Sequence, residues 1–208
     1  MEKIVDKNIT KTLKKLEKQS HLEKTRKVDV SPEKRMLAIT RDTGELINLL
    51  LFSKKAKNML EIGTSTGYST LWCAEVAKRN SGKVFTIEHD QNKIKRAKKN
   101  FSDAKVTKYI SIKNGEAVDI LESLKRKKKY HIFFDFVLID ADKENVTKYF
   151  DLVVPLVKKG GIIMTDNMTY PEKYRTHMKK LSRHIRKNSK FRTMTCQIGN
   201  GEEISVKI

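Results

Sequence analysis

The chain of 208 residues has only two cysteines, three prolines and one tryptophan. Cys73 and Cys196 form no metal-ligand spacing and are too few for a disulfide framework, so we expect two reduced, packed thiols in a cytoplasmic protein. No apolar run is long enough for a signal peptide or a membrane span, and the longest covers only residues 46–52. These absences exclude a disulfide-stapled scaffold and predict a protein that does not enter a membrane.

Internal repeats and low-complexity linkers are also missing. The apolar residues, 38% of the total, come in blocks, which is typical of one folded domain with a buried core. We expect a basic helical extension over residues 1–30 and the main domain over residues 31–208. Ile9, Leu13 and Leu16 recur at helical spacing in the extension. This stripe predicts either a contact between two copies of the chain or packing on its own domain.

Basic residues far outnumber acidic ones. The chain has 25 Asp and Glu against 45 Lys and Arg, which gives a formal net charge of +20. Such a charge is consistent with a nucleic-acid partner, an anionic small substrate, or a Lys-rich composition without a partner. Few aromatic residues accompany the basic helices, and bases would need aromatic side chains to stack on, which favours a small substrate. The basic residues expected to face an anionic substrate are Lys173, Arg175, Lys179 and Lys180.

Short apolar runs alternate with helical patterns from residue 58 onward. The expected strands cover residues 58–62, 83–88, 109–113, 134–140 and 160–166. The expected helices cover residues 32–53, 70–79, 89–100, 114–124, 144–157 and 171–188. Ser31 and Pro32 form a good cap and first turn for the helix over 32–53. The tail, residues 191–208, has two extended runs around Gly-Asn-Gly, which predicts a hairpin.

This order predicts an α/β fold: a doubly wound, mostly parallel, Rossmann-like sheet with helices on both faces and an antiparallel C-terminal hairpin. In such sheets the ligand binds beyond the carboxyl ends of the strands. The segments that directly follow strands are therefore expected to meet in one crevice. They are residues 63–69, 88–90, 114–117, 140–143 and 166–167.

The first of these segments is a glycine-rich turn in LEIGTSTGYS (60–69). Gly63 and Gly67 allow a ligand to approach the backbone closely. Hydroxyl groups near the following helix N-terminus come from Thr64, Ser65 and Ser69. The spacing is neither the dinucleotide fingerprint nor a Walker loop, so a nucleoside with a carboxylate fits better than a pyrophosphate. The alternative is a tight turn without a ligand.

Glu88 ends the second strand, where an acidic side chain grips ribose hydroxyls in nucleotide-binding α/β folds. His89 follows in the same segment. Gly115, Glu116 and Ala117, after the third strand, are expected to flank an adenine, although a helix start needs similar residues. A solvated surface glutamate is the alternative for Glu88.

Two further strands end on acidic residues. Asp140 follows FDFVLI, and Asp166 with Asn167 follows GGIIMT. Because adjacent parallel strands end at one edge, we expect these three oxygen-bearing side chains to meet. Oxygen ligands without His or Cys favour a hard cation, Mg²⁺ first, with Mn²⁺ or Ca²⁺ as alternatives. The other interpretation of each aspartate is a cap for the following helix.

LEIGTSTGYSTLW, TIEHD, DADK (140–143), GGIIMTDN and IGNGEEISVK together resemble the S-adenosylmethionine-dependent O-methyltransferases of the caffeoyl-CoA and catechol type. The resemblance implies that Asp140, Asp166 and Asn167 hold the divalent cation and that Lys143 is the catalytic base, with Asp140 also catalytic. It further implies a homodimer. The cofactor contacts that it implies, together with those expected above, are Ile39, Thr43, Glu61, Gly63, Thr64, Ser65, Gly67, Ser69, Glu88, His89, Gly115, Glu116, Ala117 and Asp140.

The expected activity is therefore divalent-metal-dependent methyl transfer from S-adenosyl-L-methionine to a small catechol-like or hydroxycinnamoyl-like hydroxylated acceptor. The alternative is a tRNA-modifying enzyme that methylates a hydroxylated uridine, since some relatives of the family resemble such enzymes. After Asn167 the chain reads MTYPEKYR, without the Trp and Gly that often follow this motif in plant-type members. A caffeoyl-CoA acceptor is therefore not supported.

Overall fold

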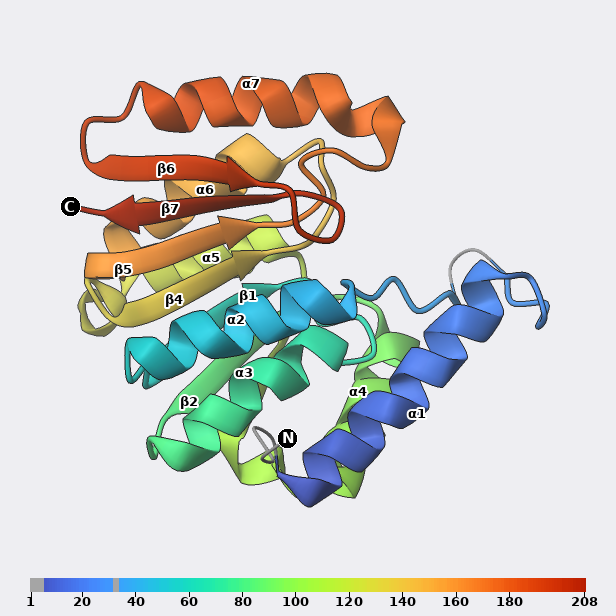
Figure 1. Ribbon diagram of the computed structural model, residues 1–208. Helices are drawn as coiled ribbons and strands as arrows, with labels where there is room; N and C mark the ends of the chain where they lie inside the picture. Colours follow the sequence, from blue (N-terminus) through green and yellow to red (C-terminus); the bar gives the residue numbers. More distant parts are fainter. Residues whose placement is uncertain (1–5, 32–33) are drawn as a thin grey trace.

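The computed structural model describes residues 6–31 and 34–208. In this part of the chain one seven-stranded sheet runs through the molecule in the order β3-β2-β1-β4-β5-β7-β6 (Figure 1). Neighbouring strands from β3 to β5 are parallel, and β7 pairs antiparallel with both β5 and β6. The strands are β1 (Asn58–Ile62), β2 (Lys83–Glu88), β3 (Ile110–Asn114), β4 (Phe134–Ile139), β5 (Val157–Thr165), β6 (Phe191–Cys196) and β7 (Glu202–Lys207).

Helices cover both faces of this sheet. One group packs on one face and the other on the opposite face, so that each face has its own apolar core (Figure 1). The first group is α1 (Lys7–Lys24), α2 (Arg41–Ser53), α3 (Tyr68–Arg79) and α4 (Gln91–Asp103). The second group is α5 (Ala117–Arg126), α6 (Val146–Val153) and α7 (Arg175–Arg186).

Successive residues of the central strands enter different cores because side chains alternate across a strand. In β1, Met59 packs with α2 and α3, whereas Leu60 packs on the other face with the residues of α5 and α6. Both are fully buried, which explains why the strands have continuous apolar runs rather than alternation. The predicted doubly wound fold with an antiparallel C-terminal hairpin is confirmed.

The N-terminal stripe packs on its own domain. Ile9, Leu13 and Leu16 are buried in the core that α1 shares with α2 and α3. Near the end of the same helix, Glu23 accepts a 2.6 Å hydrogen bond from the backbone nitrogen of Met36. This helix therefore anchors the segment that leads to α2, and its apolar stripe is not free to contact a second copy.

The helix predicted over residues 32–53 is wrong at its beginning, because α2 starts at Arg41. Pro32, half of the predicted cap, lies outside the described residues. The cap of α2 is Thr40, whose hydroxyl accepts a 3.2 Å hydrogen bond from the backbone nitrogen of Thr43. A helix that began at residue 32 would use the Met36 nitrogen for an intrahelical bond, whereas here that nitrogen donates to the Glu23 carboxylate.

Two other helices are also shorter than predicted. The one expected over residues 144–157 is α6, which ends at Val153 and continues as a 3₁₀ turn that contains Pro155. Proline has no N–H to continue the helical pattern. The one expected over 171–188 begins with a 3₁₀ turn over residues 172–174 and continues as α7.

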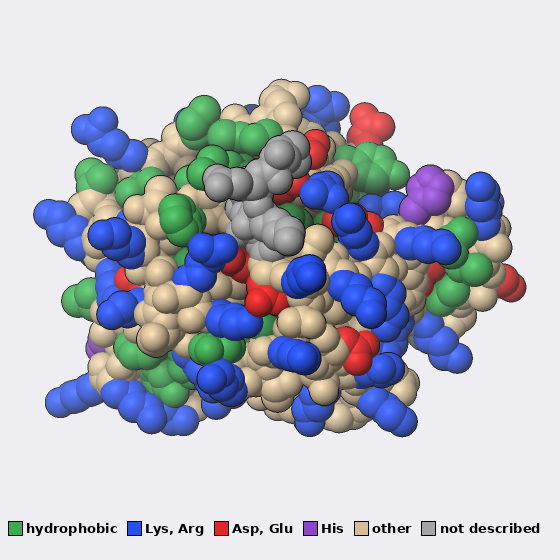
Figure 2. Space-filling model, turned by 60° about the horizontal axis from the view of Figure 1, so that its bottom comes forward, with side chains coloured by type: hydrophobic (Ala, Val, Ile, Leu, Met, Phe, Trp, Pro, Cys, Tyr) green, Lys and Arg blue, Asp and Glu red, His purple; other side chains and the backbone are tan. Residues whose placement is uncertain are grey.

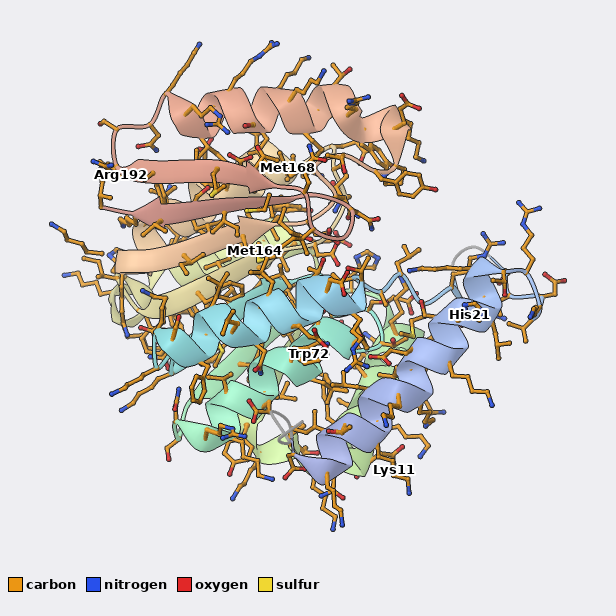
Figure 3. All side chains as sticks on the ribbon, in the orientation of Figure 1. Lys11, His21, Trp72, Met164, Met168 and Arg192 are labelled. Atoms are coloured by element: carbon orange, nitrogen blue, oxygen red, sulfur yellow. The ribbon has the colours of Figure 1, made fainter. Side chains whose placement is uncertain are left out.

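On the face drawn in Figure 2 the basic side chains are spread out rather than gathered in one patch. Figure 2 shows Lys and Arg side chains spread across one face of the molecule among a few acidic ones, and Figure 3 shows Arg192 at the outer edge of β6. Within the described part of the chain, no helix has the length and apolar character needed to cross a membrane.

Candidate active site

The glycine-rich turn follows β1 and lies over the end of β4. Gly63 has a φ of +100°, and a Cβ there would come within 2.1 Å of the backbone oxygen of Asp140. Gly67 has a φ of +86°, and its Cβ would meet the ring of Phe101 at 2.3 Å. The packing of the protein itself therefore requires glycine at both positions, because a side chain would clash there. Ligand approach, the reason given by the sequence, is not needed to explain them.

Glu88 is hydrogen-bonded to the segments that follow β1, β2 and β3. One carboxylate oxygen, Oε2, accepts a hydrogen bond of 2.8 Å from the backbone nitrogen of Ser65. The other, Oε1, accepts from the nitrogens of His89 at 3.0 Å and Asp90 at 3.1 Å. Its backbone oxygen accepts from the nitrogen of Gly115. The buried side chain therefore lies where the turns after β1, β2 and β3 meet, as predicted, rather than in solvent.

The adenine-side residues are neighbours but exposed. The ring of His89 lies 3.8 Å from the carboxylate of Glu116, and both side chains are about two-thirds exposed. Ala117 begins α5 directly after them. The segment therefore borders the Glu88 carboxylate at the open rim of the sheet.

Glu61 is a fully buried carboxylate inside β1. Burial raises its pKa to about 7, although hydrogen bonds from the hydroxyls of Ser69, Thr70 and Thr86 partly oppose the shift. The Thr86 hydroxyl donates to Glu61 Oε2 at 2.6 Å. Among the described residues Glu61 Oε1 has no partner, which is unusual for a buried polar atom.

Other buried polar atoms without partners lie in the same region of the described chain. They are Ser65 Oγ, Thr66 Oγ1, Trp72 Nε1, Thr165 Oγ1 and Glu202 Oε2. Two of these follow Gly63 in the turn, and a polar ligand with donors and acceptors would satisfy such atoms. Trp72 lies between α2 and α3, where Gly44 packs against its indole (Figure 3). The turn residues thus fit a polar nucleoside ligand.

The other predicted cofactor residues are buried on the same edge. Thr64 lies within hydrogen-bond distance of the Thr86 hydroxyl, so its own hydroxyl has a protein partner. Ile39 is 4% exposed and lies just before the Thr40 cap of α2. Thr43, in the first turn of α2, is fully buried and donates to Glu202, a residue that the sequence did not indicate.

The acidic strand ends lie on neighbouring strands. β4 and β5 are adjacent, so Asp140 and Asp166 follow neighbouring parallel strands. Burial, and to a lesser extent the charge of Asp140, raises the pKa of Asp166 to about 7. Lys143 is 7% exposed and its Nζ lies 3.3 Å from Asp140 Oδ1. Asn167 has a φ of +68° and donates its backbone N–H to Asp166 Oδ1 at 2.6 Å.

The side chains of Asp140, Asp166 and Asn167 offer carboxylate and amide oxygens, which are the ligands that a hard cation prefers. The two carboxylates repel each other, and a cation between them would relieve that repulsion. No group of three or more His, Cys, Asp or Glu side chains is assembled as a metal site in residues 6–31 and 34–208. A cation here would therefore use two carboxylates and the Asn167 amide. Asp142, by contrast, caps the next segment by accepting from the backbone nitrogen of Asn145.

Glu202 was not among the residues predicted from the sequence. It is the first residue of β7, is fully buried, and faces the Asp166 carboxylate. The signal was present in GNGEE, because a strand expected to complete the sheet began with two adjacent glutamates. The pairing of β7 with β5 was needed to place one of them at this site.

A mostly parallel sheet with a glycine-rich turn after β1, an acid after β2 and acids after β4 and β5 is typical of nucleotide-binding α/β proteins. The profile of the O-methyltransferase family matches residues 12–208. The chain belongs to the O-methyltransferase family.

Named relatives agree with this. A catechol O-methyltransferase from Niastella koreensis is 36% identical over 132 residues, which is 64% of this chain and 58% of that enzyme. Caffeoyl-CoA O-methyltransferase 5 from Nicotiana tabacum is 35% identical over 132 residues, 64% of this chain and 55% of that enzyme. The chain thus matches little more than half the length of these relatives.

Solved structures share the fold. The O-methyltransferase from Bacillus cereus in complex with SAH has a TM-score of 0.75 and 26% identity, and the match covers 95% of this chain and 91% of that one. A caffeoyl-CoA O-methyltransferase candidate from Staphylococcus aureus has a TM-score of 0.72 and 27% identity, covering 92% and 91%.

Proposed function

We propose that this chain is a divalent-cation-dependent O-methyltransferase that transfers the methyl group of S-adenosyl-L-methionine to a hydroxyl of a small catechol-like or hydroxycinnamoyl-like acceptor. The observation that carries the proposal is the placement of Asp140. Its carboxylate lies beside Lys143 and Asp166, and its backbone touches the Gly63 turn. Asp140 therefore belongs both to the acidic group after β4 and β5 and to the surroundings of the glycine-rich turn, where the cofactor would bind.

The turn residues supply the cofactor end. The Glu88 carboxylate would hold the ribose hydroxyls, because Oε2 already accepts one backbone N–H and keeps acceptor capacity. The unpartnered Oε1 of Glu61 suits the ammonium of the methionine moiety, which Ile39 and Thr43 would cover. The remaining contacts in this assignment are Gly63, Thr64, Ser65, Gly67, Ser69, His89, Gly115, Glu116, Ala117 and Asp140.

The acceptor must lose a proton before its oxygen can attack. A phenol-like hydroxyl with a pKa of about 10 is about one part in a thousand ionised at pH 7, at a cost of roughly 4 kcal/mol. A bound divalent cation supplies part of this by lowering the pKa of a coordinated hydroxyl. Asp140, Asp166 and Asn167 would hold that cation, with Mg²⁺ favoured over Mn²⁺ or Ca²⁺ for an all-oxygen set.

As a neutral amine Lys143 would receive the proton at its Nζ, and as the ammonium paired with Asp140 it would instead assist the loss of that proton electrostatically. Its side chain is buried and is oriented by Asp140 at 3.3 Å. A lysine that served only as surface charge would extend into solvent, as the amphipathic side chain of lysine usually does. Its burial beside two acids supports the catalytic assignment.

A small acceptor is the better supported substrate. The relatives named above carry small-molecule names, and none of them bears on a tRNA acceptor. The basic side chains on the face shown in Figure 2 are spread out rather than gathered at one patch. The homodimer stays a prediction, and its contact would have to avoid the Ile9, Leu13 and Leu16 stripe, which is buried within the monomer.

The test is a methyl-transfer screen with labelled S-adenosylmethionine that compares catechols, hydroxycinnamoyl compounds and bulk tRNA, each with Mg²⁺ and with EDTA. We expect labelling of a small acceptor that EDTA abolishes. Turnover that survives EDTA would remove the cation from the mechanism. Labelling of tRNA alone, with binding that weakens steeply from 50 to 200 mM salt, would move the assignment to RNA modification.

A further inference from the structure

A basic surface lies at the end of the sheet opposite to the crevice. Residues 125–129, which read Lys-Arg-Lys-Lys-Lys, come shortly before β4 and are all exposed. Lys159 is exposed near the beginning of β5, and Lys55 and Lys57 are exposed directly before β1. Because β1, β4 and β5 are parallel, these residues share one end of the sheet, on the left in Figure 1. We call these eight residues the basic edge.

Hydrogen bonds join the three segments that form the basic edge. The Asp135 carboxylate accepts from the backbone nitrogen of Lys57 at 2.9 Å and from Lys158 Nζ at 2.7 Å. The backbone nitrogen of Ile132 donates to the oxygen of Pro155 at 3.1 Å. The basic residues are therefore carried by segments that are fixed relative to one another, rather than by independent loops.

The charge of the basic edge is mostly left without a counter-charge. Arg126 pairs with Glu122 at 3.2 Å. None of the lysines of the basic edge has an acidic partner in residues 6–31 and 34–208. Lysines gathered without acids produce a positive potential that attracts a polyanionic surface.

An exposed aliphatic side chain adjoins the basic run. Ile132 is 63% exposed and has a φ of +51°, a conformation that β-branched residues rarely adopt. The ring of Tyr130 stacks on Phe134 with centroids 6.2 Å apart, and His131 Nε2 lies 2.6 Å from the oxygen of Lys125. Both rings of this segment are thus engaged within the protein, whereas nucleic acids need free rings on which bases can stack. Lysines beside an aliphatic side chain instead fit an anionic lipid surface.

We propose that the basic edge, together with Ile132, docks on a bilayer that contains anionic phospholipids. The lysines lie against the headgroups, and Ile132 enters the boundary between headgroups and acyl chains. Such docking leaves the crevice facing the aqueous side. A polynucleotide bound at the basic edge would be separated from the crevice by the length of the strands, about 17–20 Å, and could not present a base there. The inference goes beyond the proposed function and does not depend on it.

Co-sedimentation of the full chain with lipid vesicles tests the proposal. One set of vesicles is pure phosphatidylcholine, and the other contains about 30% phosphatidylglycerol. We expect binding to the anionic vesicles alone, and we expect it to weaken as salt rises from about 50 to 200 mM. Replacement of Lys127, Lys128 and Lys129 by glutamine should weaken binding about 100-fold, since each lysine near an anionic surface contributes about fivefold.

A matched control removes the same net charge elsewhere. Lys11, Lys14 and Lys18 are exposed on α1, have no acidic partner among the described residues, and lie away from the basic edge, as Figure 3 shows for Lys11. Their replacement by glutamine should weaken vesicle binding by less than about threefold, because charges farther than a Debye length from the membrane are screened.

Ile132 separates a lipid surface from a nucleic acid. Asparagine adopts a positive φ readily, so Ile132→Asn should keep the fold, and circular dichroism checks this. Loss of the aliphatic contact should weaken vesicle binding about fivefold or more, whereas Ile132→Leu should stay within about threefold of the parent. Binding to phosphates alone would be indifferent to both changes.

Three outcomes would overturn the proposal. The first is equal binding, or none, with the two kinds of vesicle. The second is an equal loss in the control on α1, since net charge rather than the basic edge would then act. The third is tight binding of bulk tRNA that needs Lys127, Lys128 and Lys129, tolerates Ile132→Asn and occurs without vesicle binding, which would assign the basic edge to nucleic acid.

Discussion

Gly63 and Asp140 are in direct backbone contact across the boundary between β1 and β4. A Cβ on Gly63 would lie 2.1 Å from the Asp140 carbonyl oxygen, and Gly63 has a φ of +100°. The backbone nitrogen of Asp140 in turn donates to the oxygen of Ile62 at 3.0 Å. The glycine-rich turn after β1 and the residue that follows β4 are therefore held in fixed positions relative to each other.

Gly63→Ala is expected to destabilise the fold strongly. The positive φ costs about 1–3 kcal/mol, and the clash with backbone adds a further 1–3 kcal/mol or so of overpacking. Urea unfolding measures the sum. Gly160→Ala is the matched control, because Gly160 has a φ of +73° but no atom nearer than Lys54 Nζ at 4.0 Å. Equal losses of unfolding free energy in the two variants would show that the clash with the Asp140 backbone does not contribute to the destabilisation.

Asp140→Ala is expected to lower turnover by more than about 100-fold, because removal of a cation ligand should exceed the loss of an outer partner. S-adenosylmethionine affinity, measured by calorimetry, should stay nearly intact, since Asp140 supplies only one of the assigned cofactor contacts and Glu88 and the glycine turn remain. Asp151→Ala, an exposed acid on α6, is the control. A large loss of cofactor affinity with normal turnover at saturation would contradict the assignment of Asp140 to the chemical step.

Glu88→Ala should mainly weaken cofactor binding, whereas Asp140→Ala should mainly lower turnover. A hydrogen bond to a charged group contributes about 1.5–3 kcal/mol, so cofactor affinity should fall about 10- to 100-fold. The same change releases three backbone nitrogens, and thermal unfolding should report a modest loss of stability. Calorimetry on Glu88→Ala and on the exposed-site variant Glu122→Ala gives the comparison. Unaltered affinity would refute the ribose role.

Glu61 predicts a pH dependence of stability. Burial raises its pKa from 4.5 to about 7, so between those values the native state binds a proton that the unfolded state has lost. The stability of the ligand-free protein should therefore fall as pH rises from about 4.5 to about 7, by up to about 3 kcal/mol for this group.

Glu61→Gln removes this titration. The free energy of unfolding of Glu61→Gln minus that of the parent should increase as pH rises. Urea unfolding at pH 5, 6, 7 and 8 measures this difference. Asp166 and Glu202, whose pKa values are also raised, remain in both proteins and cancel in the comparison. A difference that is the same at pH 5 and pH 8 would show that Glu61 is ionised throughout.

The sequence indicated most of the site because strand ends are local features. Asp140, Asp166 and Asn167 could be assigned to one edge once alternating strands and helices predicted a parallel sheet, and Glu88 could be assigned by its place after the second strand. The helix before β1 was predicted too early, since its start depends on a long-range bond between Glu23 and the Met36 nitrogen. No local pattern contains that bond.

The doubly wound fold, the glycine turn and the acidic strand ends could be predicted from local patterns, because hydrophobic periodicity and turn residues act over a few neighbours. The burial of Ile9, Leu13 and Leu16 in their own domain and the position of Glu202 opposite Asp166 became visible in the folded chain alone. Both depend on segments more than thirty residues apart in the chain, and only packing and strand register bring such segments together.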